Sequence, residues 1–285
     1  MLRIAFGIIF LVLAGCGQAD ELKNAATNLE SSKDTVAVIG TGDMGDSFGP
    51  RLAATGYQVV YGSRNPASEK VKALVALTGH GATATTQREA AQQADIILLA
   101  IPWPAMETVA QNLGDLGGKI VIDMSWPPVE YAEDGYEEIT IETSAAELIQ
   151  SWNPGAFVVK AFLNIGSYVI DDPKLANGPV SIPIASDHRV AKEKTAQIAV
   201  DLEFDPVDAG PLRFARNIES LTELLLVPWA QGRDESWILH FRRSNHYSCN
   251  PYEGDGSDWV PPPVIDADDL AVLPRTEPLL EPCSN

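Results

Sequence analysis

The chain has 285 residues, 45% of them hydrophobic and 7% aromatic, so it can bury the core of one large or two modest domains. Its 39 acidic residues outnumber its 20 basic ones, which gives a formal net charge of -19. This balance excludes a nucleic-acid partner, because phosphate binding requires a basic stripe. The three cysteines, Cys16, Cys249 and Cys283, lack metal-ligand spacing, so we expect no metal site.

The amino terminus has the pattern of an export signal. Met1-Leu2-Arg3 carries one positive charge, residues 4–14 are apolar, and Leu13-Ala14-Gly15 places small residues before Cys16. The apolar run is too short for an ordinary transmembrane helix. The segment resembles a bacterial lipoprotein signal peptide, which implies cleavage before Cys16, lipidation of that cysteine and a membrane-anchored protein on the periplasmic or cell-surface face. Two alternatives stay open: a short buried helix, or a misassigned start that would leave the protein cytoplasmic.

The first fold signal comes after this signal peptide (1–15) and a polar segment (16–34) that we interpret as a tether. Residues 35–39 form a β-branched apolar run that predicts a buried parallel strand. The run leads directly into a Gly-x-Gly-x-x-Gly turn whose residues are Gly40, Thr41, Gly42, Asp43, Met44 and Gly45. A strand, this turn and a helix together are typical of a dinucleotide-binding site, in which backbone N–H groups at the helix start meet a pyrophosphate.

The strand predicted over 57–61 indicates which dinucleotide is bound. Ser63 and Arg64 follow it, about twenty residues beyond the first glycine, where an NAD-binding chain carries Asp or Glu. A hydroxyl and a guanidinium suit a 2'-phosphate better than a ribose hydroxyl. The pair therefore predicts NADP(H), and the alternative is a solvated turn.

Helices and strands alternate over the rest of the first half. Helices are predicted over 44–54, 67–77, 88–94 and 105–116, and strands over 82–86, 95–101 and 119–124. This alternation predicts an α/β fold of the Rossmann type, a doubly wound parallel sheet. The ligand is expected beyond the carboxyl ends of the strands, at Gly40, Ser63, Ile101, Pro102 and Met124. Trp103 either covers a cofactor ring or simply packs at a strand end.

The second half carries further, shorter elements. We predict helices over 144–152, 189–202 and 212–227, and strands over 156–162, 180–185 and 204–207. The folded chain is accordingly divided into an NADP-binding Rossmann domain (35–165) and a small carboxyl-terminal α/β lobe (166–243). Residues 244–285 form a proline-rich acidic tail, in which Cys249 and Cys283 either pair or stay free.

Five blocks in chain order resemble NADPH-dependent coenzyme F420 reductases. They are equally similar to the cytosolic oxidoreductase domain of STEAP-type metalloreductases. The blocks are Ile39-Gly40-Thr41-Gly42-Asp43-Met44-Gly45, Val59-Val60-Tyr61-Gly62-Ser63-Arg64-Asn65-Pro66, Ile101-Pro102-Trp103, Val159-Lys160-Ala161-Phe162 and Asp208-Ala209-Gly210-Pro211-Leu212. The resemblance implies that NADPH lies across the sheet edge and that a flavin or deazaflavin ring stacks on its nicotinamide.

The resemblance also implies which residues contact the cofactors. The NADP contacts are matched by Thr41, Gly42, Asp43, Met44, Ser63 and Arg64, and the nicotinamide and ring cleft by Ile101, Pro102, Trp103 and Ala161. One departure is that Leu163 precedes Asn164, whereas the metalloreductase domain has Asn directly after Lys-Ala-Phe. We name no catalytic side chain, because hydride transfer between cofactors needs orientation and exclusion of water rather than a protein acid or base.

These patterns favour an NADPH-dependent oxidoreductase that transfers hydride between NADP(H) and a deazaflavin or flavin, such as F420, FMN or FAD. One alternative is a STEAP-like flavin and metal reductase, and another is an exported lipoprotein that binds a nucleotide without turnover. The export signal and the cofactor point to different places, because NADPH is made in the cytoplasm. Besides the cofactors, the expected partners are a membrane, through the lipid on Cys16, and a second copy in a homodimer.

Overall fold

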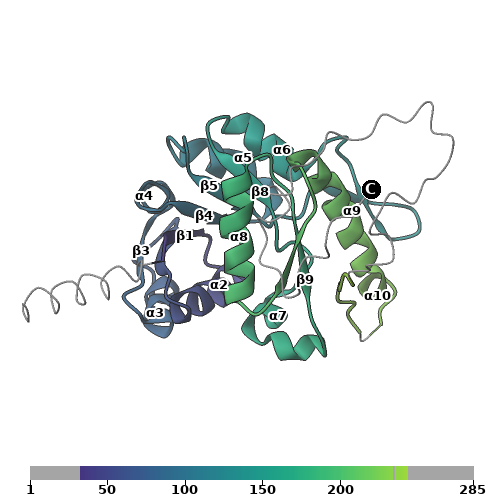
Figure 1. Cartoon of the computed structure of the whole chain (residues 1–285), viewed down its shortest axis with the longest axis horizontal. Helices are drawn as coiled ribbons and strands as arrows, with labels where there is room; N and C mark the ends of the chain where they lie inside the picture. Colours follow the sequence, from purple (N-terminus) through teal and green to yellow (C-terminus); the bar gives the residue numbers. More distant parts are fainter. Residues whose placement is uncertain (1–32, 234, 243–285) are drawn as a thin grey trace, which may run out of the picture. The chain divides into compact units, whose positions relative to one another are not determined.

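A computed structural model describes residues 33–233 and 235–242, and from Asp34 onward the chain belongs to one compact unit. Its centre is a six-stranded sheet in the order β3-β2-β1-β4-β5-β8, in which every pairing is parallel (Figure 1). The strands are β1 (Thr35–Ile39), β2 (Gln58–Ser63), β3 (Thr83–Thr86), β4 (Ile96–Leu99), β5 (Ile120–Asp123) and β8 (Phe157–Lys160). The predicted doubly wound Rossmann-type fold is confirmed.

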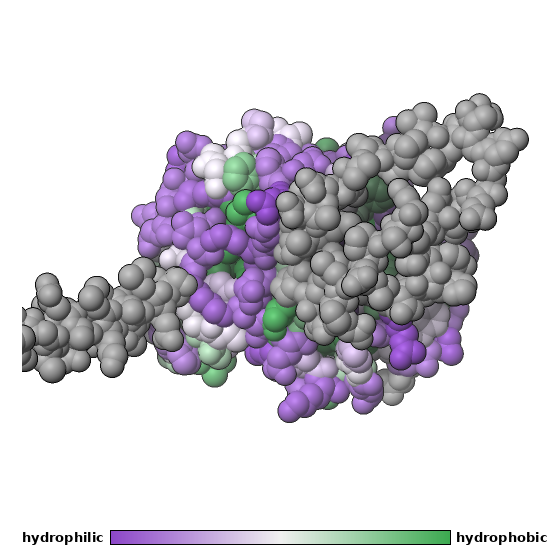
Figure 2. Space-filling model, in the orientation of Figure 1, coloured by the Kyte–Doolittle hydropathy of each residue, from purple (hydrophilic) through white to green (hydrophobic). Residues whose placement is uncertain are grey.

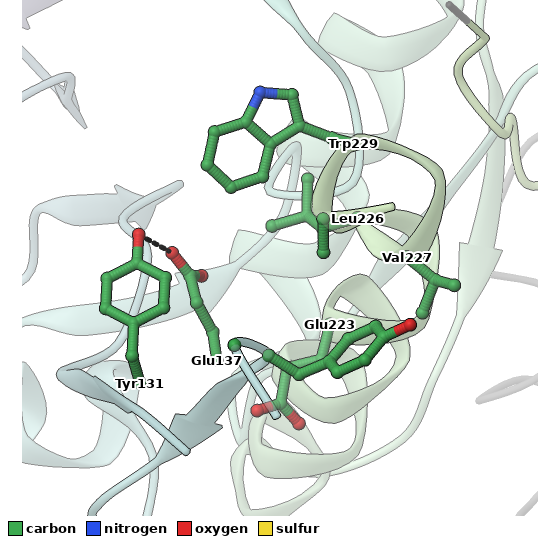
Figure 3. A pocket seen from close by; sticks show the side chains of 9 residues that line it. Tyr131, Glu137, Glu223, Leu226, Val227 and Trp229 are labelled. Atoms are coloured by element: carbon green, nitrogen blue, oxygen red, sulfur yellow. Dashed lines mark hydrogen bonds between the residues drawn. The ribbon is translucent and has the colours of Figure 1, made fainter. Parts of the chain in front are cut away.

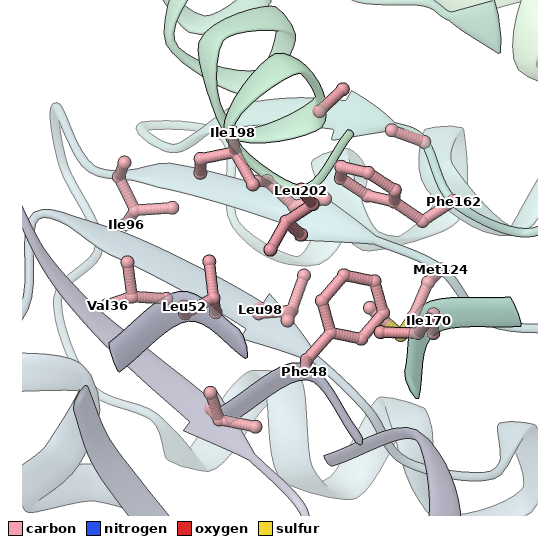
Figure 4. Close-up of a cluster of buried hydrophobic side chains, with 14 of the residues drawn as sticks. Val36, Phe48, Leu52, Ile96, Leu98, Met124, Phe162, Ile170, Ile198 and Leu202 are labelled. Atoms are coloured by element: carbon pink, nitrogen blue, oxygen red, sulfur yellow. The ribbon is translucent and has the colours of Figure 1, made fainter. Parts of the chain in front are cut away.

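Helices cover both faces of the sheet, as the unbroken apolar strands require. Successive residues of β1 point to opposite faces, so Val36 and Val38 join one core cluster while Ala37 and Ile39 join the other. The first cluster, drawn in Figure 4, receives side chains from α2 (Asp43–Ala54), α3 (Glu69–Thr78), α7 (Ser167–Asp171) and α8 (Arg189–Asp201). The second receives side chains from α4 (Gln87–Gln93), α5 (Trp103–Asn112), α6 (Ala145–Trp152) and α9 (Ala215–Leu225).

Side chains at the helix starts explain where several helices begin. Ser68 caps α3 by accepting a hydrogen bond from the Val71 N–H, and Ser144 caps α6 in the same way through the Glu147 N–H. Thr86 and Glu89 form a reciprocal capping box at α4. These caps explain the observed starts of the three helices. The starts predicted from sequence lie within two residues of them.

The carboxyl-terminal segments pack directly against the Rossmann sheet. A parallel pair, β9 (Ser181–Ile184) with β10 (Asp205–Asp208), adjoins β8 through an antiparallel bridge between Lys160 and Ala185. Its side chains enter the first core cluster beside those of β1 and α2. Arg51 of α2 reaches the same region, since its guanidinium donates to the carbonyl oxygens of Ile170 (3.0 Å) and Leu202 (2.9 Å). The residues assigned to the two predicted domains therefore share one hydrophobic core, and the boundary at 165 stays a prediction.

Three features differ from the elements predicted from sequence. A β-hairpin, β6 (Val129–Tyr131) with β7 (Glu137–Ile139), follows β5, and α7 with a 3-10 turn η1 (Pro173–Ala176) follows β8. The predicted helix over 212–227 is instead a 3-10 turn η2 (Leu212–Phe214), α9 and a short α10 (Val227–Ala230). Pro228 explains the break after Leu225, because proline lacks the N–H that would continue the helix and clashes with the preceding turn.

The surface is mainly hydrophilic over the described residues visible in Figure 2, in keeping with the charge of the chain. None of the described helices is long and apolar enough to cross a membrane. Cys16, Cys249 and Cys283 lie outside the described residues, as do the predicted signal peptide and the acidic tail, so the predictions made for them stay predictions.

Candidate functional site

The glycine turn after β1 is shaped by close backbone approaches. Gly40 has a positive φ of 117°, and a Cβ on it would lie 2.2 Å from the Ala100 carbonyl oxygen. A Cβ on Gly45 would lie 2.1 Å from the Gly40 carbonyl oxygen, so this glycine lets α2 pack on the turn. Gly42 differs, since a Cβ on it would meet no atom within 4 Å. Its backbone therefore faces open space where a ligand can approach.

The start of α2 presents backbone N–H groups beside this turn. Gly42 is its N-cap and provides no side-chain hydrogen bond, so the first N–H groups are left for another acceptor. Asp43 and Asp46 stand in the first turn, where the helix dipole favours negative charge. Partial burial, followed by the charge of Asp43, raises the pKa of Asp46. The helix end thus attracts anions through its backbone, while its two carboxylates restrict where a phosphate can lie.

A cleft opens along the carboxyl ends of β1, β2 and β4. It has about 1160 Å³ of empty space including its open mouth, which is sufficient for a dinucleotide. Seven of the residues predicted from sequence line it: Gly40, Thr41, Gly42, Ser63, Arg64, Ile101 and Pro102. The strand register explains this meeting, because Ile39 pairs with Gly62 on one side and with Leu99 on the other. Among the residues that the structure describes, no aspartate or glutamate lines this cleft.

The end of the cleft at β2 is cationic. Ser63 is buried and accepts a hydrogen bond from the Asn65 N–H (3.2 Å), while Arg64 is exposed. Lys70, the second residue of α3, also lines the cleft, and Arg88 lines an adjoining hollow together with Arg64. This end of the cleft is therefore positive, although the net charge of the chain is negative. Lys70 and Arg88 were not predicted as site residues. Their place at the cleft depends on how the turns before α3 and α4 direct these helices toward Arg64, which the sequence pattern does not show.

Six residues predicted at the site do not line the cleft. Met124 is buried in the first core cluster. Met44 packs against the first core cluster, Asp43 and Gly45 belong to the first turn of α2, and Trp103 lies beside Trp152 with ring centroids 5.8 Å apart. Ala161 is fully buried, and its N–H donates to the Asp123 carbonyl oxygen at 3.1 Å. These contacts give the six residues roles in packing or helix geometry, and the cofactor contacts predicted for them stay predictions.

A buried ionic cluster lies at the other end of the same edge of the sheet, at the carboxyl ends of β5 and β8. The Lys160 ammonium lies 2.9 Å from Asp123 Oδ2, 2.7 Å from the Ser125 carbonyl oxygen and 2.9 Å from Glu219 Oε1. All three charged side chains are essentially inaccessible to solvent. Glu219 also accepts from the Ala145 N–H (3.0 Å), and burial raises its pKa. The cluster thereby joins β5, β8, the start of α6 and α9.

One residue with a strained backbone and two unpaired polar side-chain atoms lie close in sequence to the residues of this ionic cluster. Phe162 directly follows β8 with a positive φ of 63°, although it is fully buried, and it packs edge-on against Phe48 with centroids 5.2 Å apart. Within the described part of the chain, Ser125 Oγ and Asn164 Oδ1 are buried without a hydrogen-bond partner. Leu163 displaces Asn164 from the position directly after Lys-Ala-Phe. This departure from the metalloreductase pattern therefore lies beside the positive φ of Phe162.

Comparison with known proteins identifies the family. The family described as NADP oxidoreductase coenzyme F420-dependent matches residues 35–127. The chain is 32% identical over 206 residues to the F420-dependent NADP reductase of Methanothermobacter marburgensis, covering 67% of this chain and 90% of that protein. This chain belongs to that family. The resemblance inferred from sequence is therefore confirmed, and with it the class of NADP-dependent oxidoreductase.

Two further comparisons concern a longer relative and solved structures. The chain is 34% identical over 203 residues to the human metalloreductase STEAP2, covering 70% of this chain but only 38% of that protein. A structure from Arthrobacter sp. FB24, described as an F420-dependent NADP-reductase, has a TM-score of 0.63 at 24% identity over 70% of this chain and 96% of that one. The protein SMa0349 from Sinorhizobium meliloti has a TM-score of 0.56 at 27% identity and covers 66% of this chain and 91% of its own. These structures share the fold.

Proposed function

We propose that the protein binds NADPH in the cleft at β1, β2 and β4 and transfers its hydride to a deazaflavin or flavin. One observation carries this proposal: the end of the cleft at Ser63 and Arg64 is cationic, and none of the described carboxylates lines it. A 2'-phosphate is stabilised there, whereas a free ribose hydroxyl finds no carboxylate acceptor. The open space at Gly42 fits the pyrophosphate of the same cofactor.

The residues of the cleft would act by binding and orientation. Backbone N–H groups at the start of α2 hold the pyrophosphate, and Arg64 with Lys70 hold the 2'-phosphate. Ile101 and Pro102 provide an apolar wall that fixes the nicotinamide and excludes water. The bound NADPH supplies the hydride, so no protein side chain has to move a proton.

The choice of NADPH over NADH is tested with Arg64→Ala. Removing a charge-assisted hydrogen bond to the 2'-phosphate costs about 1.5–3 kcal/mol, equivalent to a roughly 10- to 150-fold loss of NADPH affinity. NADH affinity should stay unchanged, because NADH lacks that phosphate. Isothermal titration of both cofactors against wild type and variant measures this. Equal losses for the two cofactors would sink the 2'-phosphate assignment, and no NADPH binding by the wild type would sink the proposal as a whole.

The acceptor is tested by following NADPH oxidation with F420, FMN, FAD and a ferric chelate. Rapid turnover with F420 or a flavin alone supports the proposed reaction. The metalloreductase alternative is favoured by the identity to STEAP2, and it predicts reduction of the ferric chelate that depends on added flavin. Tight NADPH binding without any turnover would favour the non-catalytic alternative.

We also propose that the protein is anchored to a membrane through a lipid on Cys16. The support is the sequence pattern of residues 1–16. Replacing Cys16 with Ser should move the protein from the membrane fraction to the soluble fraction of the expressing cells. Unchanged membrane association would contradict lipidation at this residue. A homodimer stays a proposal as well, tested by sedimentation of the purified protein.

A further inference from the structure

A second pocket lies between the β6–β7 hairpin and the α9–α10 segment, and it shares no lining residue with the dinucleotide cleft. Figure 3 shows Tyr131 beside Glu137 on the hairpin side, and Leu226 and Trp229 on the α10 side. The empty space, including the open mouth, is about 310 Å³. Most of this space is open mouth rather than enclosed cavity, so a ligand here would lie against the wall of the pocket, and a second dinucleotide would not fit.

Two carboxylates at this pocket have no counter-ion in the part of the chain that the structure describes. Glu137 accepts hydrogen bonds from the Trp126 indole N–H (3.1 Å) and the Tyr131 hydroxyl (3.0 Å), and Glu223 accepts one from the Ile139 N–H (3.0 Å). All these donors are neutral. Within the described residues neither glutamate forms a salt bridge, and Arg216, which lies in the adjoining acidic hollow, is paired with Glu147 at 2.9 Å. The pocket therefore holds negative charge that the described protein does not neutralise.

The same pocket is walled by aromatic rings. Tyr131, Tyr136 and Trp229 line it, and Leu226 and Val227 complete the apolar part. Trp229 is 64% exposed and Tyr131 65% exposed, so large ring surfaces face solvent in the ligand-free protein. Aromatic faces attract cations, so exposed rings beside carboxylates offer a cation two kinds of favourable contact.

We propose that this pocket binds an organic ammonium cation, with its alkyl groups against the aromatic rings and its charge facing Glu137 and Glu223. An anion would be repelled by the two carboxylates, and a neutral apolar ligand would leave their charge uncompensated. A metal ion fits less well, because the described residues contain no group of three metal-ligating side chains. Burial and the nearby charges of Glu137 and Glu138 raise the pKa of Glu223, and a bound cation would offset that repulsion. This proposal does not depend on the proposed redox function.

The charge requirement is tested with choline and its neutral isostere 3,3-dimethylbutan-1-ol, which have nearly the same shape. Isothermal titration of the purified protein should give a millimolar dissociation constant for choline, a modest affinity typical of an open site. The neutral alcohol should bind at least about tenfold more weakly, because it lacks the cation–π and carboxylate interactions. Equal binding of the two, or no binding of choline up to about 100 mM, would overturn the proposal.

Variants locate the binding. Glu223→Gln keeps an oxygen for the Ile139 N–H but removes the charge, and Trp229→Leu removes an exposed ring, so both should fold. Each should weaken choline binding about five- to thirtyfold. Trp237→Phe is the matched control, because Trp237 is another exposed tryptophan (40%) that does not line the pocket. A loss of choline binding in Trp237→Phe equal to that in Trp229→Leu would place the binding elsewhere and contradict the assignment.

Discussion

The two ends of one edge of the sheet differ in whether their charged side chains are accessible or buried. At the carboxyl ends of β1 and β2, Arg64 and Lys70 line an open cleft. At the carboxyl ends of β5 and β8, Lys160 is fully buried between Asp123 and Glu219. The difference teaches that the cations at the open end remain accessible to a ligand, whereas the cation at the closed end joins elements of the protein itself. The two ends should therefore respond differently to mutation, one in binding and the other in stability.

The largest effect is expected from Lys160→Met. This change leaves two carboxylates buried without their cation, which lowers the free energy of unfolding by about 3–5 kcal/mol. Urea denaturation measures the loss. Combining it with Asp123→Asn and Glu219→Gln removes the unpaired charges while keeping oxygens for the Ser125 and Ala145 N–H groups, and should restore much of the stability. A triple variant as unstable as Lys160→Met would show that packing, rather than charge, dominates this site.

The next largest effect is expected in the glycine turn, where a substitution of Gly45 should change stability and one of Gly42 should change cofactor affinity. Gly45→Ala should destabilise the protein by about 1–3 kcal/mol, because its Cβ would overlap the Gly40 carbonyl oxygen. Gly42→Ala has room for its Cβ, so stability should change by less than about 0.5 kcal/mol. Its methyl group nevertheless stands where the pyrophosphate approaches, and NADPH affinity should fall. Unfolding curves and NADPH titrations of both variants measure this, and a destabilised Gly42→Ala with normal affinity would reverse the assignment.

A smaller effect, on NADPH affinity, is expected from a substitution of Lys70 at the cationic end of the cleft. Lys70→Met should weaken NADPH about five- to tenfold and leave NADH unchanged, because an exposed ammonium contributes less than a guanidinium fork. Lys72→Met is the control on the same helix, since Lys72 pairs with Glu69 at 2.8 Å and does not line the cleft. Similar losses in both variants would indicate a general effect of net charge rather than a contact of Lys70.

The smallest effect is the pH dependence of the buried end. Burial raises the pKa of Glu219 above its unfolded value near 4.5, so the folded state binds this proton more tightly. The resulting stabilisation is fully present below the unfolded pKa and is lost as the pH rises through the folded pKa. Wild type should therefore lose stability relative to Glu219→Gln above pH 4.5, by at most about 1.4 kcal/mol per pH unit. A difference that is constant with pH would show that Glu219 does not titrate differently on folding.

The open end could be predicted because its signals are local in sequence. The apolar strand, the glycines at 40, 42 and 45, and the Ser63-Arg64 pair each occur within a short stretch, and parallel pairing then brings their ends together. Capping residues such as Ser68, Thr86 and Ser144 fixed the helix starts in the same local way.

The closed end could not be predicted, because its residues are distant in sequence. Asp123, Lys160 and Glu219 carry no pattern of their own, and their meeting depends on the packing of α9 over the sheet. The hairpin was also missed, since its two strands have three residues each and are only partly buried. Trp103 illustrates a third case, because the sequence pattern of an aromatic residue at a strand end does not show whether the ring only packs on the protein, as Trp103 packs on Trp152, or also contacts a ligand.

Arg51 has a consequence for the order in which the protein can fold. It joins α2 to backbone carbonyls 119 and 151 residues further along the chain. Side chains of α8 and Phe204 also complete the core against which α2 packs. During synthesis, the amino-terminal half therefore stays without one wall of its core until the ribosome has released residues beyond 204. Contacts of such long sequence separation slow folding, so this protein should reach its native state late and as a single cooperative unit.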